Sequence, residues 1–157
     1  MIVTVYNYQN AKEIIPSEMS SKLIDIMESL DYKLKLYKKD DFKDALISKL
    51  NTNGWSGKVK LSAKSSITIT SMQKKIGLCF QFGNMARMYA DMLKLQALYL
   101  DGKIQAAVYI VPMRECAKRI GENIANYERL LNELTNVFTK VVTVPILLIG
   151  FDNEREV

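Results

Sequence analysis

The stretch IGLCFQFGN, residues 76–84, carries the clearest fold signal in the chain. Bulky apolar side chains alternate there with smaller or polar ones, and this period of two predicts a β-strand. Asn84, at the end of the stretch, is a residue type that caps helices, and apolar residues at helical spacing follow it through Leu100 until Asp101-Gly102. The segment therefore predicts a strand that leads directly into a long helix.

The residues before this stretch predict a β-meander. Apolar and polar side chains alternate over residues 58–70, and the polar run 71–75 is suited to a turn. Residues 76–82 then form the returning strand of a hairpin. The segment 58–82 is thus expected to form neighbouring antiparallel strands.

The rest of the chain alternates between strand and helix patterns. Residues 104–111 form a nearly unbroken apolar run closed by Pro112, which predicts a strand covered on both faces. The other expected elements are strands near residues 2–6 and 141–149 and helices over residues 16–30, 40–50 and 119–138. This order predicts an α/β protein with a mixed central sheet and helices on both faces.

The composition fits one globular domain spanning residues 1–157. The chain is 48% hydrophobic and 25% charged, and its length allows a core that needs no disulfide. It has no histidine, which excludes Ser-His-Asp and Cys-His catalysis, and Cys79 and Cys116 are expected to be buried thiols. With no secretory signal and no apolar run of about 18 residues, we expect a soluble cytoplasmic protein with no membrane partner.

The positive charge is concentrated in one segment. Lys and Arg number 22 against 17 Asp and Glu, yet no carboxylate occurs between Asp44 and Asp91. Concentrated positive charge with interleaved hydroxyls and amides is typical of surfaces that contact phosphates, although lysine-rich hairpins can also be merely solvated. The candidate DNA-binding residues in this segment are Lys58, Lys60, Lys64, Ser65, Ser66, Lys74, Lys75, Asn84 and Arg87.

A second basic group follows the strand that ends at Pro112. Arg114, Lys118, Arg119 and Asn123 lie in what the sequence predicts to be a loop and a helix start. Arginine can bind the edge of guanine and asparagine that of adenine, so these four residues are further candidate DNA contacts. An exposed helix end of mixed charge is the alternative.

Several short phrases resemble one known family. The junction Phe80-Gln81-Phe82-Gly83-Asn84 and the predicted element order resemble the BglII type of type II restriction endonuclease. Further phrases that agree are Tyr6-Asn7-Tyr8, Ala11-Lys12-Glu13-Ile14, Phe42-Lys43-Asp44, Gly54-Trp55, Tyr127-Glu128 and Val144-Pro145-Ile146-Leu147. The resemblance covers almost the whole chain. It implies a restriction-endonuclease-like fold of the PD-(D/E)xK class that binds double-stranded DNA as a homodimer.

The resemblance also implies where an active site would lie. In this family an acidic residue is followed about nine positions later by Glu-x-Gln or Glu-x-Lys, and the two carboxylates hold Mg²⁺. By the same spacing the acidic positions here are Thr70 and Cys79, and Gln81 matches the last position. A neutral hydroxyl and a soft thiol suit Mg²⁺ poorly. We therefore expect a DNA-binding protein with a degenerate, catalytically inactive site and no metal or other cofactor.

Two alternatives remain open. One is an active endonuclease, with Mg²⁺ as its cofactor, in which another carboxylate has replaced a missing ligand near Gln81. The nearest candidates in the sequence are Asp40, Asp41, Asp44 and Asp91. The other alternative is a protein-interaction module whose partner packs on a methionine-rich helix face formed by Met85, Met88 and Met92.

Overall fold

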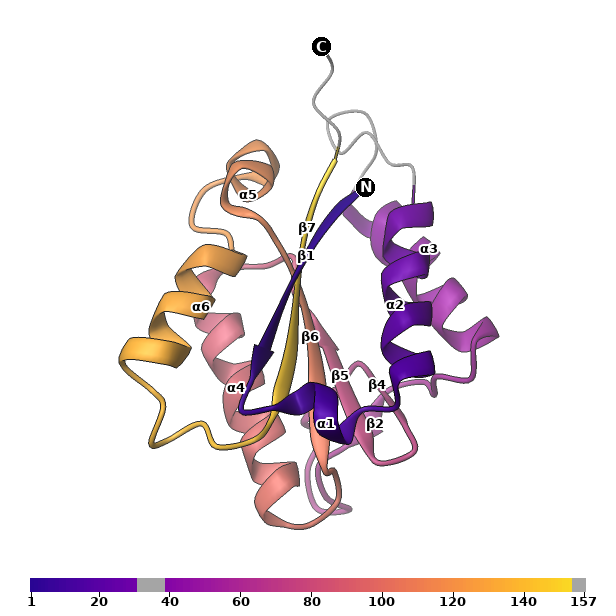
Figure 1. Ribbon diagram of the computed structural model, residues 1–157, viewed down its shortest axis with the longest axis vertical. Helices are drawn as coiled ribbons and strands as arrows, with labels where there is room; N and C mark the ends of the chain where they lie inside the picture. The colour runs from indigo at the N-terminus through magenta and orange to yellow at the C-terminus, as the bar shows by residue number, and fades with distance from the viewer. Residues whose placement is uncertain (31–38, 154–157) are drawn as a thin grey trace.

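A five-stranded mixed sheet forms the centre of the molecule, and helices cover both of its faces (Figure 1). The computed structural model describes residues 1–30 and 39–153. In chain order the elements are β1 (Ile2–Tyr8), α1 (Ala11–Ile14), α2 (Ser17–Ser29), α3 (Lys39–Thr52), β2 (Val59–Lys60), β3 (Thr68–Ile69), β4 (Ser71–Gln73), β5 (Ile76–Phe80), α4 (Met85–Leu100), β6 (Ala106–Pro112), α5 (Arg114–Ile120), α6 (Tyr127–Asn136) and β7 (Ile146–Asp152). The α/β class predicted from the sequence is confirmed.

The central sheet has the strand order β1-β7-β6-β5-β4. Strands β5, β6 and β7 run parallel, and β4 and β1 form antiparallel edges. Every residue of β6 is buried, as its unbroken apolar sequence predicts. Because β5, β6 and β7 point the same way, Phe80, Pro112 and Asp152 all lie at one end of the sheet, while Lys74 and Lys75 precede β5 at the other end.

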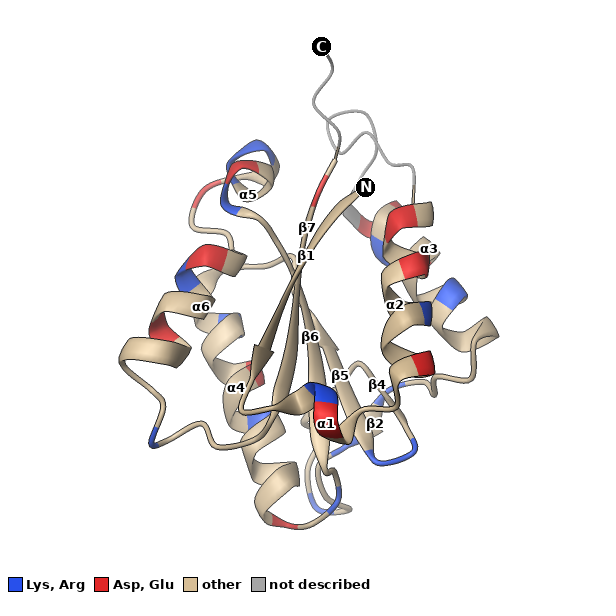
Figure 2. Cartoon of the chain, in the orientation of Figure 1, with Lys and Arg blue, Asp and Glu red and all other residues tan. Residues whose placement is uncertain are grey.

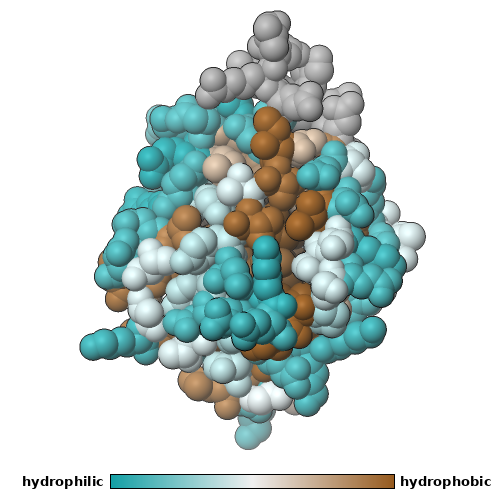
Figure 3. Space-filling view, viewed as in Figure 1, coloured by the Kyte–Doolittle hydropathy of each residue, from teal (hydrophilic) through white to brown (hydrophobic). Residues whose placement is uncertain are grey.

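Two hydrophobic cores hold the helices on the sheet. Side chains of α2 and α3, including Leu23 and Phe42, pack on one face, and side chains of α4 and α6, including Met88 and Leu130, pack on the other. Strand β1 lies at the edge between these layers, so its apolar side chains are only partly covered. Figure 3 shows this apolar strip over β1, where Ile2 is 56% exposed.

Helix α4 begins and ends where the sequence predicts. The Asn84 side-chain oxygen accepts a hydrogen bond from the Arg87 backbone N–H at 3.1 Å, which caps the first turn. At the other end Gly102 has a φ of +71°, a left-handed conformation that glycine adopts at low cost. Residues 81–84 alone join β5 to this helix, so the strand fixes the position of the helix start.

The single helix predicted over residues 119–138 is wrong. The structure has two separate helices there, α5 and α6, joined by the loop 121–126. Asn123 has a φ of +53°, which a continuous right-handed helix cannot contain. Asn126 then accepts a hydrogen bond from the Arg129 backbone N–H at 3.0 Å and caps α6.

The loop 121–126 is held by the junction between β5 and α4. The Met85 N–H donates to the Asn123 carbonyl at 3.1 Å, and the Ala125 N–H donates to the Gly83 carbonyl at 2.9 Å. A β-bridge also pairs residues 84 and 124. This backbone pairing compensates for the interrupted helix, and the apolar pattern of residues 119–138 does not reveal it.

The predicted meander is present only in part. Residues 58–70 contain two short strands, β2 and β3, which form a separate two-stranded sheet around the loop 61–67. Residues 71–73, expected to be part of a turn, form β4 instead. The turn consists of Lys74 and Lys75 alone, with φ values of +47° and +60°, and two positive φ angles are those of a type I′ hairpin turn.

The last strand, predicted over residues 141–149, is shifted along the chain. Residues 138–142 form turns that include a hydrogen bond from the Val142 N–H to the Phe138 carbonyl at 2.8 Å, and β7 begins only at Ile146. The strand near the amino end and the helices predicted over residues 16–30 and 40–50 correspond to β1, α2 and α3. In residues 1–30 and 39–153, no helix combines the length and apolar character needed to cross a bilayer.

Candidate active site and nucleic-acid interface

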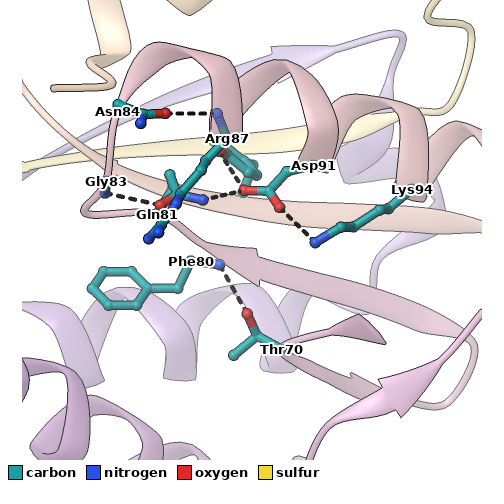
Figure 4. A network of polar contacts seen from close by, with 9 residues as sticks. Thr70, Phe80, Gln81, Gly83, Asn84, Arg87, Asp91 and Lys94 are labelled. Atoms are coloured by element: carbon teal, nitrogen blue, oxygen red, sulfur yellow. Dashed lines mark hydrogen bonds and ion pairs between the residues drawn. The ribbon is translucent and has the colours of Figure 1, made fainter. Parts of the chain in front are cut away.

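The residues expected at the degenerate active site lie near one another at the end of β5, and Figure 4 shows two of them, Thr70 and Gln81. Cys79 belongs to β5, Gln81 follows its last residue, and Thr70 lies between β3 and β4. The Thr70 hydroxyl oxygen accepts a hydrogen bond from the Phe80 backbone N–H at 3.2 Å. The Cys79 thiol interacts with the backbone of Thr70. The structure therefore brings the three predicted positions into one cluster.

The side-chain amide of Gln81 is held at both ends. Its Nε2 donates to an Asp91 carboxylate oxygen at 2.8 Å, and its Oε1 accepts a hydrogen bond from the Gly83 backbone N–H at 2.8 Å. Figure 4 shows these bonds between β5 and the first turns of α4. Through these two bonds Gln81 joins the end of β5 to the start of α4 and holds the strand-to-helix junction in place.

Asp91 is the acidic residue that the fold places beside Gln81. It lies on the inner face of α4, where it is only 5% exposed, and it accepts a hydrogen bond from the Tyr109 hydroxyl at 2.9 Å. Its second oxygen forms an ion pair with the Lys94 ammonium at 3.4 Å. The three donors compensate the buried carboxylate, as burial of a charge requires.

The other acids considered from the sequence lie elsewhere. Asp40, Asp41 and Asp44 are exposed residues of α3, which covers the opposite face of the sheet. In residues 39–153 no hydrogen bond or ion pair joins them to Gln81 or Asp91. Of the four candidates, Asp91 alone contacts Gln81.

Cys79 is neutral in this environment. Its side chain is 2% exposed, and burial raises the pKa of the thiol well above its ordinary value. The negative charge of Asp91 raises that pKa further. Burial, reinforced by Asp91, also raises the pKa of the Tyr109 hydroxyl. The neighbours of Asp91 therefore stay protonated and do not add negative charge to the cluster.

The cluster does not fit a Mg²⁺ ion. This cation prefers several free oxygen ligands, whereas the cluster offers a hydroxyl, a protonated thiol, an amide with both ends engaged and a carboxylate with three donors. Across the described ranges 1–30 and 39–153 there is no group of three or more acidic, cysteine or histidine side chains placed to hold a metal. We assign no catalytic step to this cluster.

A basic cavity of about 320 Å³ lies near the start of α4. It is bounded by the first residue of α4, by α5, by the loop 121–126 and by α6. The polar side chains in its lining are Arg114, Lys118, Asn123, Asn126 and Arg129, with no carboxylate among them. Such a concave basic surface with amide groups is suited to an anionic ligand.

The cations around this cavity differ in their partners. Lys118 pairs with Glu115 at 2.8 Å, and Arg129 pairs with Glu133 at 2.9 Å. The exposed guanidinium of Arg114 has no ion pair within the described part of the chain. Arg119, also a predicted DNA contact, instead pairs with Asp152 at the end of β7 and donates to Asn153 at 2.9 Å.

The predicted DNA-binding residues divide between two ends of the sheet. Asn84, Arg87 and the residues of α5 and loop 121–126 lie at the end where β5 finishes, near Gln81. The group at the opposite end, where β5 begins, consists of Lys58, Lys60, Lys64, Ser65, Ser66, Lys74 and Lys75. Figure 2 shows lysines on the loops at this lower end and the basic residues of α5 at the upper end.

Two contributors to the site were not predicted from the sequence. Tyr109 lies in the uninterrupted apolar run of β6, where the sequence pattern indicates only a core residue. The hydrogen bond from its hydroxyl to Asp91 depends on the packing of α4 against the sheet. Arg129 lies on the polar side of α6, and the wrong continuous helix concealed its place beside the cavity. A polar residue within an apolar helix face, such as Asp91, is the signal that indicates a buried network.

Two solved structures that match this fold are crystal structures of a restriction endonuclease. A crystal structure of the restriction endonuclease BglII complexed with a DNA 16-mer matches the chain with a TM-score of 0.83 at 14% identity, over 100% of this chain and 79% of that one. The crystal structure of free BglII matches with a TM-score of 0.78 at 16% identity, over 100% and 82% of the two chains. The fold is that of the restriction endonucleases.

Sequence comparison gives the family. Residues 3–151 match the model of the family described as restriction endonuclease BglII/BglIII, so the chain belongs to that family. The type II restriction enzyme BamHI of Bacillus amyloliquefaciens is 28% identical over 81 residues, which are 52% of this chain and 36% of that enzyme. The chain thus matches over about a third of the length of that relative. The resemblance noted in the sequence is confirmed.

Proposed function

We propose that the chain is a DNA-binding protein on a restriction-endonuclease fold of the PD-(D/E)xK class, and that it does not hydrolyse DNA. The donor set at the end of β5 carries this proposal. Where the family pattern needs two free carboxylates, the chain has the Thr70 hydroxyl and the buried, neutral Cys79 thiol. The alternative of a relocated carboxylate rests on Asp91, whose oxygens are already engaged by protein donors.

The surface around the basic cavity supports binding of double-stranded DNA. Arg114 and Lys118 bring positive charge to it, and Arg87 and Asn84 lie exposed at the adjoining start of α4. Arginine and asparagine side chains there are suited to phosphates and base edges. The BglII structure of the same fold holds a DNA 16-mer, which is consistent with this ligand class.

Both cysteines are free and buried, as expected in a reducing cytoplasm.

A binding experiment tests this proposal. We expect the protein to shift a 30-base-pair duplex of mixed sequence, with an affinity that falls steeply as salt rises, because each neutralised phosphate releases a counterion. Arg114→Ala combined with Lys118→Ala should weaken binding at 0.1 M salt about tenfold or more. Mobility-shift assays at salt concentrations from about 0.05 to about 0.3 M measure both the salt dependence of the affinity and the effect of the double variant.

Two controls make this result specific. Lys22→Ala with Lys140→Ala removes the same charge from exposed positions away from the cavity and should leave the affinity nearly unchanged. Native protein incubated with supercoiled plasmid and Mg²⁺ or Mn²⁺ should leave the plasmid intact. Nicking at ordinary enzyme amounts would support the active alternative, and equal binding by both double variants would contradict the DNA-binding surface.

We further propose that the protein forms a homodimer through the outer side of α4. Leu93 and Leu100 lie two turns apart on this helix and are 68% and 73% exposed. Val137 and Val141, after α6, are also largely exposed, and the contact between Tyr89 and Phe138 joins α4 to this region. A second copy would cover these apolar groups, whose exposure to water is unfavourable.

The variant Leu93→Lys tests this interface. A charge at this exposed position should leave the fold intact but disfavour burial against a second copy, and dimer dissociation should become at least about tenfold easier. Sedimentation velocity over a dilution series measures the change, and Leu93→Met is the conservative control. A monomeric native protein at micromolar concentration, or a Leu93→Lys dimer of native strength, would contradict the proposal.

A further inference from the structure

Three lysine-bearing segments converge at the end of the sheet where β5 begins. The Lys103 ammonium donates to the Leu61 carbonyl at 2.6 Å, which ties the loop after β2 to the segment between α4 and β6. The Gln105 N–H donates to the Lys75 carbonyl at 2.8 Å and ties the hairpin turn to the same segment. We call this surface the lysine end; its cations are Lys58, Lys60, Lys64, Lys74, Lys75 and Lys103.

The charge of the lysine end is not neutralised by the protein. All six lysines are exposed, and within residues 1–30 and 39–153 none of them forms an ion pair with a carboxylate. The segments contributing lysines 58–75 contain no acidic residue, and Asp101 is the acid closest in sequence to Lys103. Six like charges gathered without carboxylate partners raise the free energy of the surface, and an anionic ligand would relieve their repulsion.

The turn at the lysine end carries backbone strain in addition. Lys74 and Lys75 both adopt left-handed backbone conformations. Glycine and asparagine adopt this conformation readily, but it is unfavourable for lysine. A type I′ turn of this kind is ordinarily Asn-Gly. Two lysines therefore occupy positions where their side chains oppose the backbone geometry, and retained strain of this kind is typical of functional sites.

The lysine end and the basic cavity lie at opposite ends of the sheet. The cavity lies near the start of α4, just after β5 ends, whereas Lys74 and Lys75 precede the first residue of β5. The full length of β5 and α4 separates the two basic regions, and Figure 2 shows the basic residues of α5 and the lysine-bearing loops at opposite ends of the molecule. A duplex that lies across the cavity, with its axis perpendicular to β5, would leave the lysine end free.

We propose that the lysine end is a second, sequence-independent binding surface for the phosphate backbone of duplex DNA, so that one protein holds two DNA segments. Lysine is a point charge without the planar, bidentate geometry that reads bases, which suits it to phosphate contact alone. The serine hydroxyls of Ser65 and Ser66, within the same loop, add short donors of the kind that bind phosphate oxygens. The bridging of two segments rests on the proposed function, because the other segment is the one bound at the cavity.

A two-duplex capture experiment tests this inference. Protein is mixed with a biotinylated and a fluorescent 30-base-pair duplex, and fluorescence retained on streptavidin measures bridging. The variant Lys74→Asn with Lys75→Gly should reduce bridging about tenfold or more at 0.1 M salt, while the affinity for a single duplex changes little. Because Asn-Gly suits the turn, the same variant should melt about 3–6 °C higher than the native protein, which excludes unfolding as the cause.

Further variants separate the possible failures. Lys58→Gln with Lys60→Gln removes charge from the lysine end without touching the turn and should also reduce bridging about tenfold or more. Lys22→Gln with Lys140→Gln is the matched control and should bridge like the native protein. Bridging that survives in both lysine-end variants, as it would if the cavities of two protomers held the two duplexes, overturns the inference. Single-duplex binding insensitive to Arg114 and Lys118 would instead overturn the proposed function.

Discussion

Replacing Thr70 by aspartate and Cys79 by glutamate together is expected to create a Mg²⁺ site that the native chain lacks. The Thr70 hydroxyl bonds to the backbone of Phe80, the residue before Gln81, and the Cys79 thiol contacts the backbone of Thr70, so we expect the two new carboxylates to converge. Mg²⁺ at about 100 times its dissociation constant stabilises a protein by about 2.7 kcal/mol, which corresponds to roughly 5–10 °C in a chain of this size. Thermal melts with and without Mg²⁺ measure the shift.

The same double variant should gain nuclease activity. A Mg²⁺ ion held by two carboxylates would activate a water molecule and stabilise the negative charge that develops on the phosphate during hydrolysis. Plasmid nicking that requires Mg²⁺, absent from the native protein, is the expected result. The neutral pair Thr70→Asn with Cys79→Gln matches the size of the new side chains and should show neither effect. A Mg²⁺-dependent melting shift already present in the native protein would contradict the inactive site.

Before metal is added, the carboxylate pair should lower stability. Glutamate at position 79 would be buried and would face the negative charge of Asp91, as the thiol does now. Burial of an unpaired charge near a like charge is unfavourable, and we expect the metal-free variant to lose about 2–4 kcal/mol. Urea unfolding in EDTA measures this loss. The measurement distinguishes a variant that does not fold from one that folds but does not bind Mg²⁺.

Replacing Asp91 by alanine is expected to destabilise the protein by about 3–5 kcal/mol. The change would leave the buried Tyr109 hydroxyl and the Gln81 amide nitrogen without an acceptor, and it would open a small space beneath α4. Urea unfolding followed by tryptophan fluorescence of Trp55 gives the free energy of unfolding.

Two neighbouring variants show which contact matters. Lys94→Met removes only a partly exposed ion pair at 3.4 Å and should cost less than about 1 kcal/mol. Tyr109→Phe removes one of the hydrogen bonds to the carboxylate and should cost about 1–2 kcal/mol. If the free energy of unfolding of Asp91→Ala lies within about 1 kcal/mol of the native value, the carboxylate does not organise the junction of β5 and α4.

The parts of the fold that were predicted correctly are those where local pattern and burial agree. The run that became β6 is apolar without interruption and is buried along its whole length. The strand of residues 76–80, the cap at Asn84 and the end of α4 near Gly102 each follow from short-range chemistry. Nothing distant in the chain had to be known to place them.

The errors arose where distant backbone pairing decides the structure. The apolar spacing of residues 119–138 fits one helix, but the bonds from loop 121–126 to residues 83–85 favour a break. In the hairpin, Lys74 and Lys75 adopt a conformation for which their own propensity is poor, so residues 71–75 read as one long turn. Both outcomes depend on contacts between segments that no local pattern contains.

The candidate site was predictable in membership but not in arrangement. The family resemblance, through the spacing of its motif, indicated Thr70, Cys79 and Gln81, and in the structure Thr70 contacts both Phe80 and Cys79. Which way the Gln81 amide points, and that Asp91 rather than an acid of α3 lies beside it, depend on how α4 packs over β5. Likewise, Lys74 and Lys75 are close to Gln81 in sequence but lie at the opposite end of the sheet, because the strand β5 separates them from it.

The pairing of loop 121–126 with residues 83–85 has a kinetic consequence. Backbone hydrogen bonds join the wall of the basic cavity to the same short segment whose Gly83 N–H holds Gln81. The two therefore form one rigid unit that is already shaped before any ligand arrives. We expect association to be governed by diffusion and electrostatic attraction, with no slow conformational step in stopped-flow traces.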